Sequence, residues 1–107
     1  MTESEYSQLA DTTFAHIEHV LEHADSDLDY ELAAGGVLEI EFDNGSKIII
    51  NRQGANHEIW VAAKSGGFHF RWLDNAWRDT RNSTELMQSL SKLVALQGGG
   101  EVDFSQN

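Results

Sequence analysis

The spacing of apolar residues changes twice along the chain, and this change limits the possible folds more than any other feature. From residue 3 to about residue 23 apolar side chains recur every three or four positions, which predicts an amphipathic helix. Through the middle of the chain they alternate with polar ones, the period of a β-strand. Helical spacing returns at residues 86–97, and glycines at 98–100 end it. The sequence therefore predicts strands between two helices.

Five strands and a short sixth are expected in the alternating part. They are placed at residues 27–32, 37–43, 47–52, 58–63 and 68–73, with the sixth near Trp77. Asn44 and Gly45 predict a type I′ hairpin turn, and residues 65–67 predict a second tight hairpin. We therefore expect residues 1–107 to form a single α+β domain. Its architecture is a two-layer sandwich, with an antiparallel sheet of five or six strands and both terminal helices on one sheet face.

The end of the chain gives two more local signals. Asn82 and Glu85 form a candidate capping pair for the second helix. The tail, residues 101–107, is expected either to be loose or to pack Phe104 onto the sheet edge.

Alternation also predicts which strand residues face the core. The inward positions of the first two strands are Leu28, Tyr30, Leu32, Leu38, Ile40 and Phe42. Trp60 lies between the core candidates Ile59 and Val61, so it is expected on the solvent face. There it either covers cross-strand neighbours or anchors a protein interface beside Asn51 and Gln53, and the sequence leaves both interpretations open.

Charge is distributed unevenly along the chain. The net charge is -11, and residues 1–46 contain twelve of the 18 Asp and Glu residues but no Lys or Arg. Nucleic acids and anionic membranes require positive surface, so neither is an expected partner. The asymmetry instead favours cations or a positively charged protein.

Composition excludes several other classes of function. The absence of cysteine excludes disulfides, thiolate nucleophiles and cysteine-ligated clusters. No nucleophile elbow or phosphate-binding glycine loop is present. The apolar runs are too short to cross a bilayer and the polar start is unlike a targeting leader, so we expect a cytoplasmic protein. Because the catalytic motifs are missing, we do not expect an enzyme with a closed active site.

Acidic side chains form the main candidate metal site, which we call the acidic strip. They are spaced to share a helix face and a strand face, and they are Glu18, Glu22, Asp25, Asp27, Asp29 and Glu31. Neighbours in such rows are about 5–7 Å apart, too far for a tight cage, so hard cations such as iron would be held weakly. The alternative is a solvated surface, but like charges without interleaved Lys repel one another, which argues against it.

Three histidines lie on the same predicted helix. His19 and His23 have the four-residue spacing that can chelate a metal, and His16 lies one turn earlier. Zinc is conceivable, although no third ligand is evident. The alternative is that these are surface histidines that at most assist the carboxylates.

The central part of the sequence resembles the frataxin family, and more closely its bacterial members. The resemblance lies in residues 44–53, 59–62, 66–70 and 25–29. It implies the same helix–sheet–helix fold, weak binding of Fe²⁺ or Fe³⁺, and a part in iron-sulphur cluster assembly. The implied partners are a cysteine desulfurase, which the protein would regulate while acting as a possible iron donor, and the scaffold protein. A monomer is implied, with iron-induced oligomers as the alternative.

Family roles can be transferred to particular positions. The residues implied to contact the desulfurase are Glu18, Glu22, Asp27 and Asp29 on the acidic strip, and Asn51, Gln53 and Trp60 on the sheet face. His19 and His23 depart from the acidic or neutral helix expected of the family, so the metal preference could differ. Two rival functions remain: a ferroxidase or iron-storage enzyme that oxidises Fe²⁺ on the strip, and a structural interaction domain with incidental metal binding.

Overall fold

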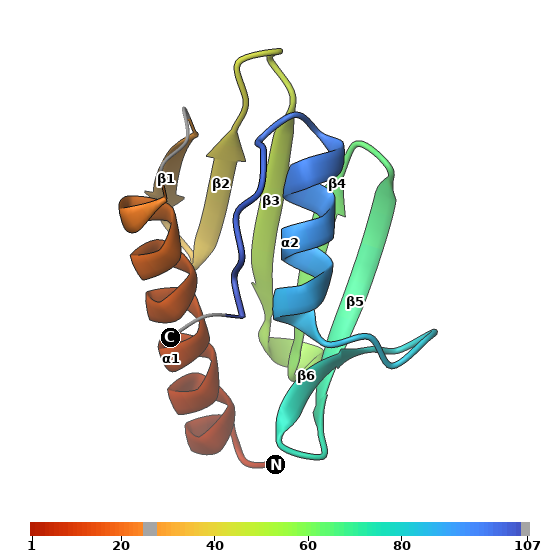
Figure 1. The fold of residues 1–107 in the computed structure, drawn as a ribbon. Coiled ribbons are helices and arrows are strands. Elements are labelled where there is room, and N and C mark those ends of the chain that lie inside the picture. The colour runs from red at the N-terminus through yellow and green to blue at the C-terminus, as the bar shows by residue number, and fades with distance from the viewer. Residues whose placement is uncertain (25–27, 106–107) are drawn as a thin grey trace.

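The structure is a computed structural model that describes residues 1–24 and 28–105. The alternating middle of the chain forms one antiparallel sheet, with one helix before it and one after it in the sequence (Figure 1). The sheet has six strands in the order β1-β2-β3-β4-β5-β6, so every strand pairs with its neighbour in sequence. The elements are α1 (Glu3–His23), β1 (Asp29–Ala33), β2 (Val37–Glu41), β3 (Lys47–Gln53), the short 3-10 helix η1 (Gly54–Asn56), β4 (Glu58–Ala63), β5 (Gly66–Leu73), β6 (Ala76–Asp79) and α2 (Leu86–Leu96). The predicted α+β sandwich is confirmed.

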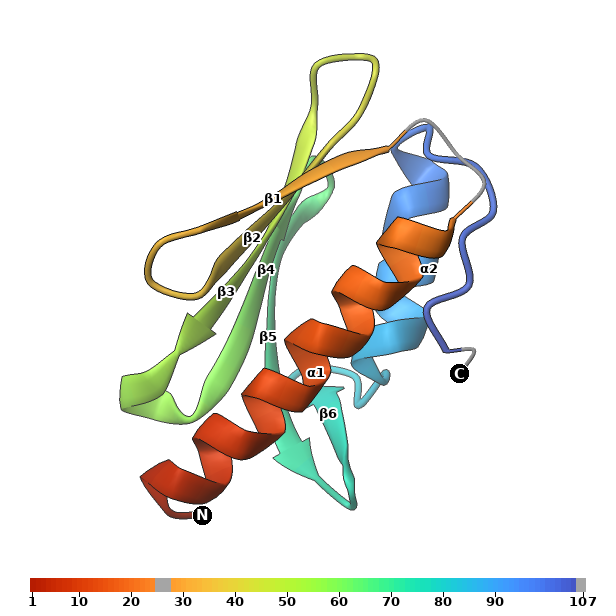
Figure 2. The same ribbon diagram turned by 90° about the vertical axis from the view of Figure 1, so that its left-hand side faces the viewer.

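Both helices cover the same face of the sheet, and the other face is open (Figure 2). Strand side chains alternate accordingly: Ile48 and Ile50 of β3 are fully buried, whereas Ile49 between them is only partly buried. We call the helix-covered side the inner face and the opposite side the outer face. Among the described residues, neither helix is long and apolar enough to cross a membrane.

Helix α1 begins at a capping box. The Glu5 backbone N–H donates to Thr2 Oγ1, and the Thr2 N–H donates in return to Glu5 Oε1, so two end donors of the helix are satisfied. The buried residues of α1 recur at helical spacing and are Tyr6, Ala10, Thr13, Phe14, Ile17 and Leu21. This apolar stripe sets the face that α1 turns toward the sheet and leaves its acidic residues outside.

The inward positions predicted for β2 and its extension are confirmed, because Leu38 and Ile40 are fully buried and Phe42 is 4% exposed. Leu32 of β1 is an exception, being 52% exposed. It lies near the β1–β2 turn, which extends beyond α1, so no helix covers it (Figure 2).

Both predicted hairpin connections were wrong in detail. Asn44 has an ordinary negative φ and only Gly45 is left-handed, at φ 86°; the Gly45 N–H donates to Phe42 O, closing a three-residue loop instead of a type I′ turn. The type I′ pattern occurs at Asp74 and Asn75, which both have positive φ between β5 and β6. The β4–β5 turn is made by residues 64–65, since Gly66 already pairs with Ala63.

The start of α2 also differs from the prediction. Glu85 is itself the N-cap, and its Oε2 accepts a hydrogen bond from the Met87 N–H. The Asn82 side chain instead accepts from the Thr84 N–H within the preceding turn. The two residues therefore close consecutive turns and do not form a reciprocal pair.

The tail completes the inner face. Phe104 is fully buried and Val102 is 7% exposed, and the segment after α2 runs back between the two helices (Figure 1). The Phe104 N–H donates to Ser91 Oγ on α2, and its carbonyl oxygen lies 2.6 Å from His16 Nε2 on α1. Phe104 thus packs between the helices, and not on the sheet edge.

Candidate functional site

The helix part of the predicted acidic strip lies where α1 passes the edge strand β1. The Tyr30 hydroxyl of β1 donates a hydrogen bond of 2.6 Å to Glu22 Oε1. That bond, with the negative charges of Glu22 and Glu18 nearby, raises the pKa of Tyr30 to about 12. The carboxylates of Glu18 and Glu22 therefore both lie close enough to Tyr30 to affect its pKa, so they lie together near the C-terminal end of α1.

The strand part of the strip lies on the opposite side of β1. Tyr30 points toward α1, so its neighbours Asp29 and Glu31 point to the outer face. There Asp29 stands opposite Glu41, and Glu31 stands opposite Glu39. We call Asp29, Glu31, Glu39 and Glu41 the outer acidic cluster; with Tyr30 and Lys47 they line a shallow depression of about 170 Å³.

One cation lies in this cluster, and it pairs with the two β2 acids and with no described residue of the predicted strip. Lys47 Nζ lies 3.3 Å from Glu39 Oε1 and 3.9 Å from Glu41 Oε2. Arg52, at the opposite end of β3, pairs instead with Asp11 of α1 at 2.6 Å. Within the described part of the chain, no ion pair is formed by Glu18, Glu22, Asp29 or Glu31.

The structure thus brings the predicted carboxylates to one edge of the sheet but divides them between its two sides. Asp25 and Asp27, which connect the two rows in sequence, lie outside the described residues. Among the residues that are described, no three His, Asp or Glu side chains converge closely enough to enclose a metal ion. The described carboxylates are therefore dispersed over two surfaces at this edge of the sheet.

The helix histidines have different environments. His16 is partly buried and bonds to the Phe104 carbonyl oxygen, so it has a structural partner. His19 and His23 are exposed, and their ring centroids are 4.3 Å apart. The structure therefore brings the second pair together at the helix surface and separates His16 from it.

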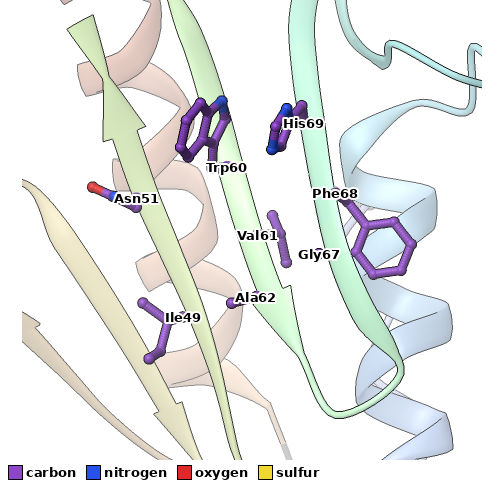
Figure 3. Close-up of a pocket in the computed structure, with 8 residues that line it drawn as sticks. All are labelled: Ile49, Asn51, Trp60, Val61, Ala62, Gly67, Phe68 and His69. Carbon is purple, nitrogen blue, oxygen red and sulfur yellow. The ribbon is translucent and has the colours of Figure 1, made fainter.

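The sheet-face residues predicted for partner binding lie side by side at the centre of the outer face. Trp60 of β4 pairs with Asn51 of β3 and with His69 of β5, and the Trp60 and His69 rings stack at 4.3 Å with an 8° interplanar angle (Figure 3). Gln53, partly buried, shares this face two residues after Asn51. Here the outer face has a depression of about 190 Å³, which we call the aromatic patch, lined by Ile49, Asn51, Trp60, Val61, Ala62, Gly67, Phe68 and His69.

A buried carboxylate supports the aromatic patch. The Glu58 side chain is 6% exposed and accepts hydrogen bonds from Trp60 Nε1 at 2.8 Å and from Arg71 at 2.7 Å. Burial raises the pKa of Glu58, but these two hydrogen bonds, the Arg71 charge and the nearby His69 outweigh it, so the net pKa lies below its usual value. Glu58 therefore fixes the indole orientation as an ionised acceptor.

Sequence reasoning missed two parts of this surface. The first is the pairing of Glu39 with Glu31 and of Glu41 with Asp29 across the β1–β2 hairpin. This pairing could have been found by extending the hairpin register from β1 to β2. The contacts of Glu58 with Trp60 and Arg71 could not be read as easily, because a single Glu in an alternating strand normally indicates an exposed position.

Comparisons with known proteins show which family the chain is similar to. Residues 1–100 match the family model described as a frataxin-like domain. The iron-sulfur cluster assembly protein CyaY of Dechloromonas aromatica is 57% identical over 99 residues, covering 92% of this chain and 94% of the relative. The CyaY protein of Paraburkholderia phymatum is 49% identical, covering 98% of this chain and 99% of the relative.

Solved structures show the same fold. Frataxin from Psychromonas ingrahamii superposes with a TM-score of 0.91 at 36% identity, covering 99% of this chain and all of that one (100%). Trimeric frataxin from the yeast Saccharomyces cerevisiae, in a ferrous complex, has a TM-score of 0.65 at 31% identity over 90% of this chain and 85% of that one. The chain therefore belongs to the frataxin family.

Proposed function

We propose that this protein takes part in iron-sulphur cluster assembly as a non-catalytic regulator that binds a cysteine desulfurase and holds iron weakly. The relatives named as assembly proteins cover nearly the whole chain, which supports the general role. The observation that carries the finer proposal is the crowding of carboxylates on both sides of β1. Glu18, Glu22, Asp29 and Glu31 have no ion-pair partner among the described residues.

Iron would be the cargo of this surface. Carboxylate oxygens are hard donors that suit Fe²⁺ and Fe³⁺, and like charges facing each other on paired strands are relieved when a cation binds between them. Asp29 opposite Glu41 and Glu31 opposite Glu39 are two such pairs. Because no closed cage is formed by the described residues, each ion would keep several waters and leave easily. The proposed iron ligands are Glu18, Glu22, Asp25, Asp27, Asp29 and Glu31, and His19 and His23 on the same helix would at most assist them.

The desulfurase contact would combine two kinds of surface. The strip would attract a basic region of the partner over a distance, which raises the association rate and makes binding depend on salt. The aromatic patch would then add short-range contact through Trp60, Asn51 and Gln53, since an indole held in place by neighbours suits an interface anchor. The scaffold protein is a further proposed partner of the same complex.

Matched pairs of neutralising substitutions test the proposal. We expect Glu18→Gln/Glu22→Gln and Asp29→Asn/Glu31→Gln each to weaken desulfurase binding and anaerobic Fe²⁺ binding by at least about tenfold, roughly 0.7 kcal/mol or more per removed charge. The amide oxygen introduced by Glu22→Gln can still accept the Tyr30 hydrogen bond, so the α1–β1 contact is kept. Isothermal titration with purified desulfurase and with Fe²⁺ measures both affinities.

The control removes the same number of charges elsewhere. Asp74→Asn/Glu101→Gln neutralises two exposed acids that do not belong to the strip, and Asn tolerates the positive φ at position 74. We expect wild-type affinities for this control. Equal binding by the strip variants and the control would reject the proposal.

A further inference from the structure

The last two turns of α1 carry an exposed pair of imidazoles. His19 and His23 are four residues apart and therefore lie on one helix face. Their ring centroids are 4.3 Å apart and the rings are tilted by 36°. Both side chains are exposed to solvent, so an ion can reach them without any change in the fold.

The hydrogen bond of His23 fixes which of its nitrogens is free. His23 Nδ1 lies 2.8 Å from the backbone oxygen of His19. Because a carbonyl oxygen can only accept, this contact requires a proton on Nδ1, which in the neutral ring leaves the lone pair on Nε2. Metal-ligating histidines show the same arrangement, in which the second ring nitrogen donates to a backbone carbonyl and orients the ring. His23 is thus already in the tautomer that a metal ion requires.

The partner ring can meet the same ion. The ring nitrogens of His19 form no hydrogen bond with the described part of the chain, so either is free to coordinate. Two nitrogens bound to one Zn²⁺ ion are at most about 4.2 Å apart, twice the metal–nitrogen distance of about 2.1 Å. The ring centroids are 4.3 Å apart, so rotations about the side-chain bonds are enough to bring one nitrogen of each ring within this distance.

We propose that His19 and His23 form a separate site for one borderline divalent ion, Cu²⁺ most tightly and Zn²⁺ next, with water completing the coordination. Imidazole nitrogen favours these ions, and the order of affinity follows the Irving–Williams series. The negative end of the α1 dipole favours a cation at this position. The site does not depend on the proposed iron function, because it uses nitrogen donors that the carboxylate strip lacks.

Among the residues that the structure describes, two imidazoles meet at this site. His16, one turn earlier on α1, is partly buried and has its Nε2 2.6 Å from the Phe104 carbonyl oxygen, so this ring is held toward the tail and away from the exposed pair. No group of three metal-binding side chains is found in the described residues. The expected affinity is therefore that of a two-imidazole chelate, below that of a closed structural zinc site.

Titration of Cu²⁺ and Zn²⁺ into the apo protein tests the site, with His19→Gln, His23→Gln and the double variant. We expect one Cu²⁺ ion to bind the wild-type protein, and each single variant to bind it at least about tenfold more weakly, because only one imidazole remains. His57→Asn is the matched control: it removes an imidazole elsewhere, at φ 52°, where Asn is tolerated. We expect the control to bind Cu²⁺ as the wild-type protein does.

Long-range ¹H–¹⁵N correlation spectra give a second readout that does not depend on a variant folding correctly. In the apo protein His23 should show the Nδ1–H tautomer, and Zn²⁺ should shift Nε2 of His23 together with one ring nitrogen of His19. Wild-type Cu²⁺ affinity in the double variant would overturn the proposal. So would loss of Cu²⁺ binding in Glu18→Gln/Glu22→Gln with both histidine variants unaffected, which would assign the ion to the carboxylates.

Discussion

The two faces of the sheet are made by the same strands, yet they differ in polarity and in whether other elements cover them. The inner face is apolar and covered by α1, α2 and the tail, with Ile50, Ile59 and Phe70 fully buried. The outer face is uncovered, with acids at the β1–β2 end and the aromatic patch at its centre. Because side chains alternate along a strand, neighbouring residues of the same strand form the two faces. Inner-face residues therefore contribute mainly to stability, and outer-face residues are available for recognition.

The difference predicts that inner-face substitutions change stability most. Phe104→Ala should have the largest effect, lowering the free energy of unfolding by about 3–5 kcal/mol, because it removes a fully buried ring between the helices and leaves a cavity. Urea denaturation followed by circular dichroism measures it. A loss below about 1 kcal/mol would show that the tail is not part of the inner face.

Glu58→Gln tests the buried acid that lies beside Trp60 in the same strand and accepts its hydrogen bond. We expect a loss of about 1–2 kcal/mol at pH 7, because a charged acceptor for Trp60 and Arg71 becomes neutral. The pKa of Glu58 is lowered in the folded protein, so this contribution is complete above the unfolded pKa of about 4.3 and is lost as pH falls through the folded pKa. Unfolding measured from pH 7 to pH 3 should therefore show the wild-type advantage shrinking at the acidic end. An advantage that grows toward low pH would contradict this account.

Trp60→Ala should separate recognition from stability on the outer face. The partly buried indole contributes its stacking on His69 and one hydrogen bond, so we expect a loss of only about 1 kcal/mol in stability. Desulfurase affinity, measured by titration, should fall by at least about tenfold. A stability loss as large as that of Phe104→Ala would place Trp60 in the core instead.

Lys47→Gln should have the smallest effect on stability. Lys47 is 47% exposed and shares its charge between Glu39 and Glu41, so we expect a change within about 0.5 kcal/mol at physiological salt. At low salt the loss should increase, because the four carboxylates of the outer acidic cluster then repel one another without screening. Denaturation at two salt concentrations checks this, and a salt-independent effect would contradict the electrostatic explanation.

Local pattern was enough to predict the sheet and its inner face. The alternation at Leu38, Ile40 and Phe42 predicts burial without knowledge of any other element, and the structure confirms it. Turn geometry was harder, because Asn44–Gly45 and Asp74–Asn75 both suit tight hairpins and the length of the paired strands decides which becomes type I′.

Contacts between distant segments could not be predicted from local pattern. Phe104 is one of only two apolar residues in the polar tail, with Val102, and only the space between α1 and α2 explains its burial. The bond from Tyr30 to Glu22 depends on how closely α1 passes β1, which residue spacing does not specify. The division of Glu18 and Glu22 from Asp29 and Glu31 by β1 was therefore not predicted from the sequence.

Desulfurase affinity measured across a range of salt concentrations tests the central claim most directly. The account predicts that wild-type affinity falls steeply with salt, that Glu18→Gln/Glu22→Gln flattens this dependence, and that Trp60→Ala weakens binding without changing the slope. Wild-type binding that is insensitive to salt, or a slope unaltered by loss of the two helix carboxylates, would contradict it.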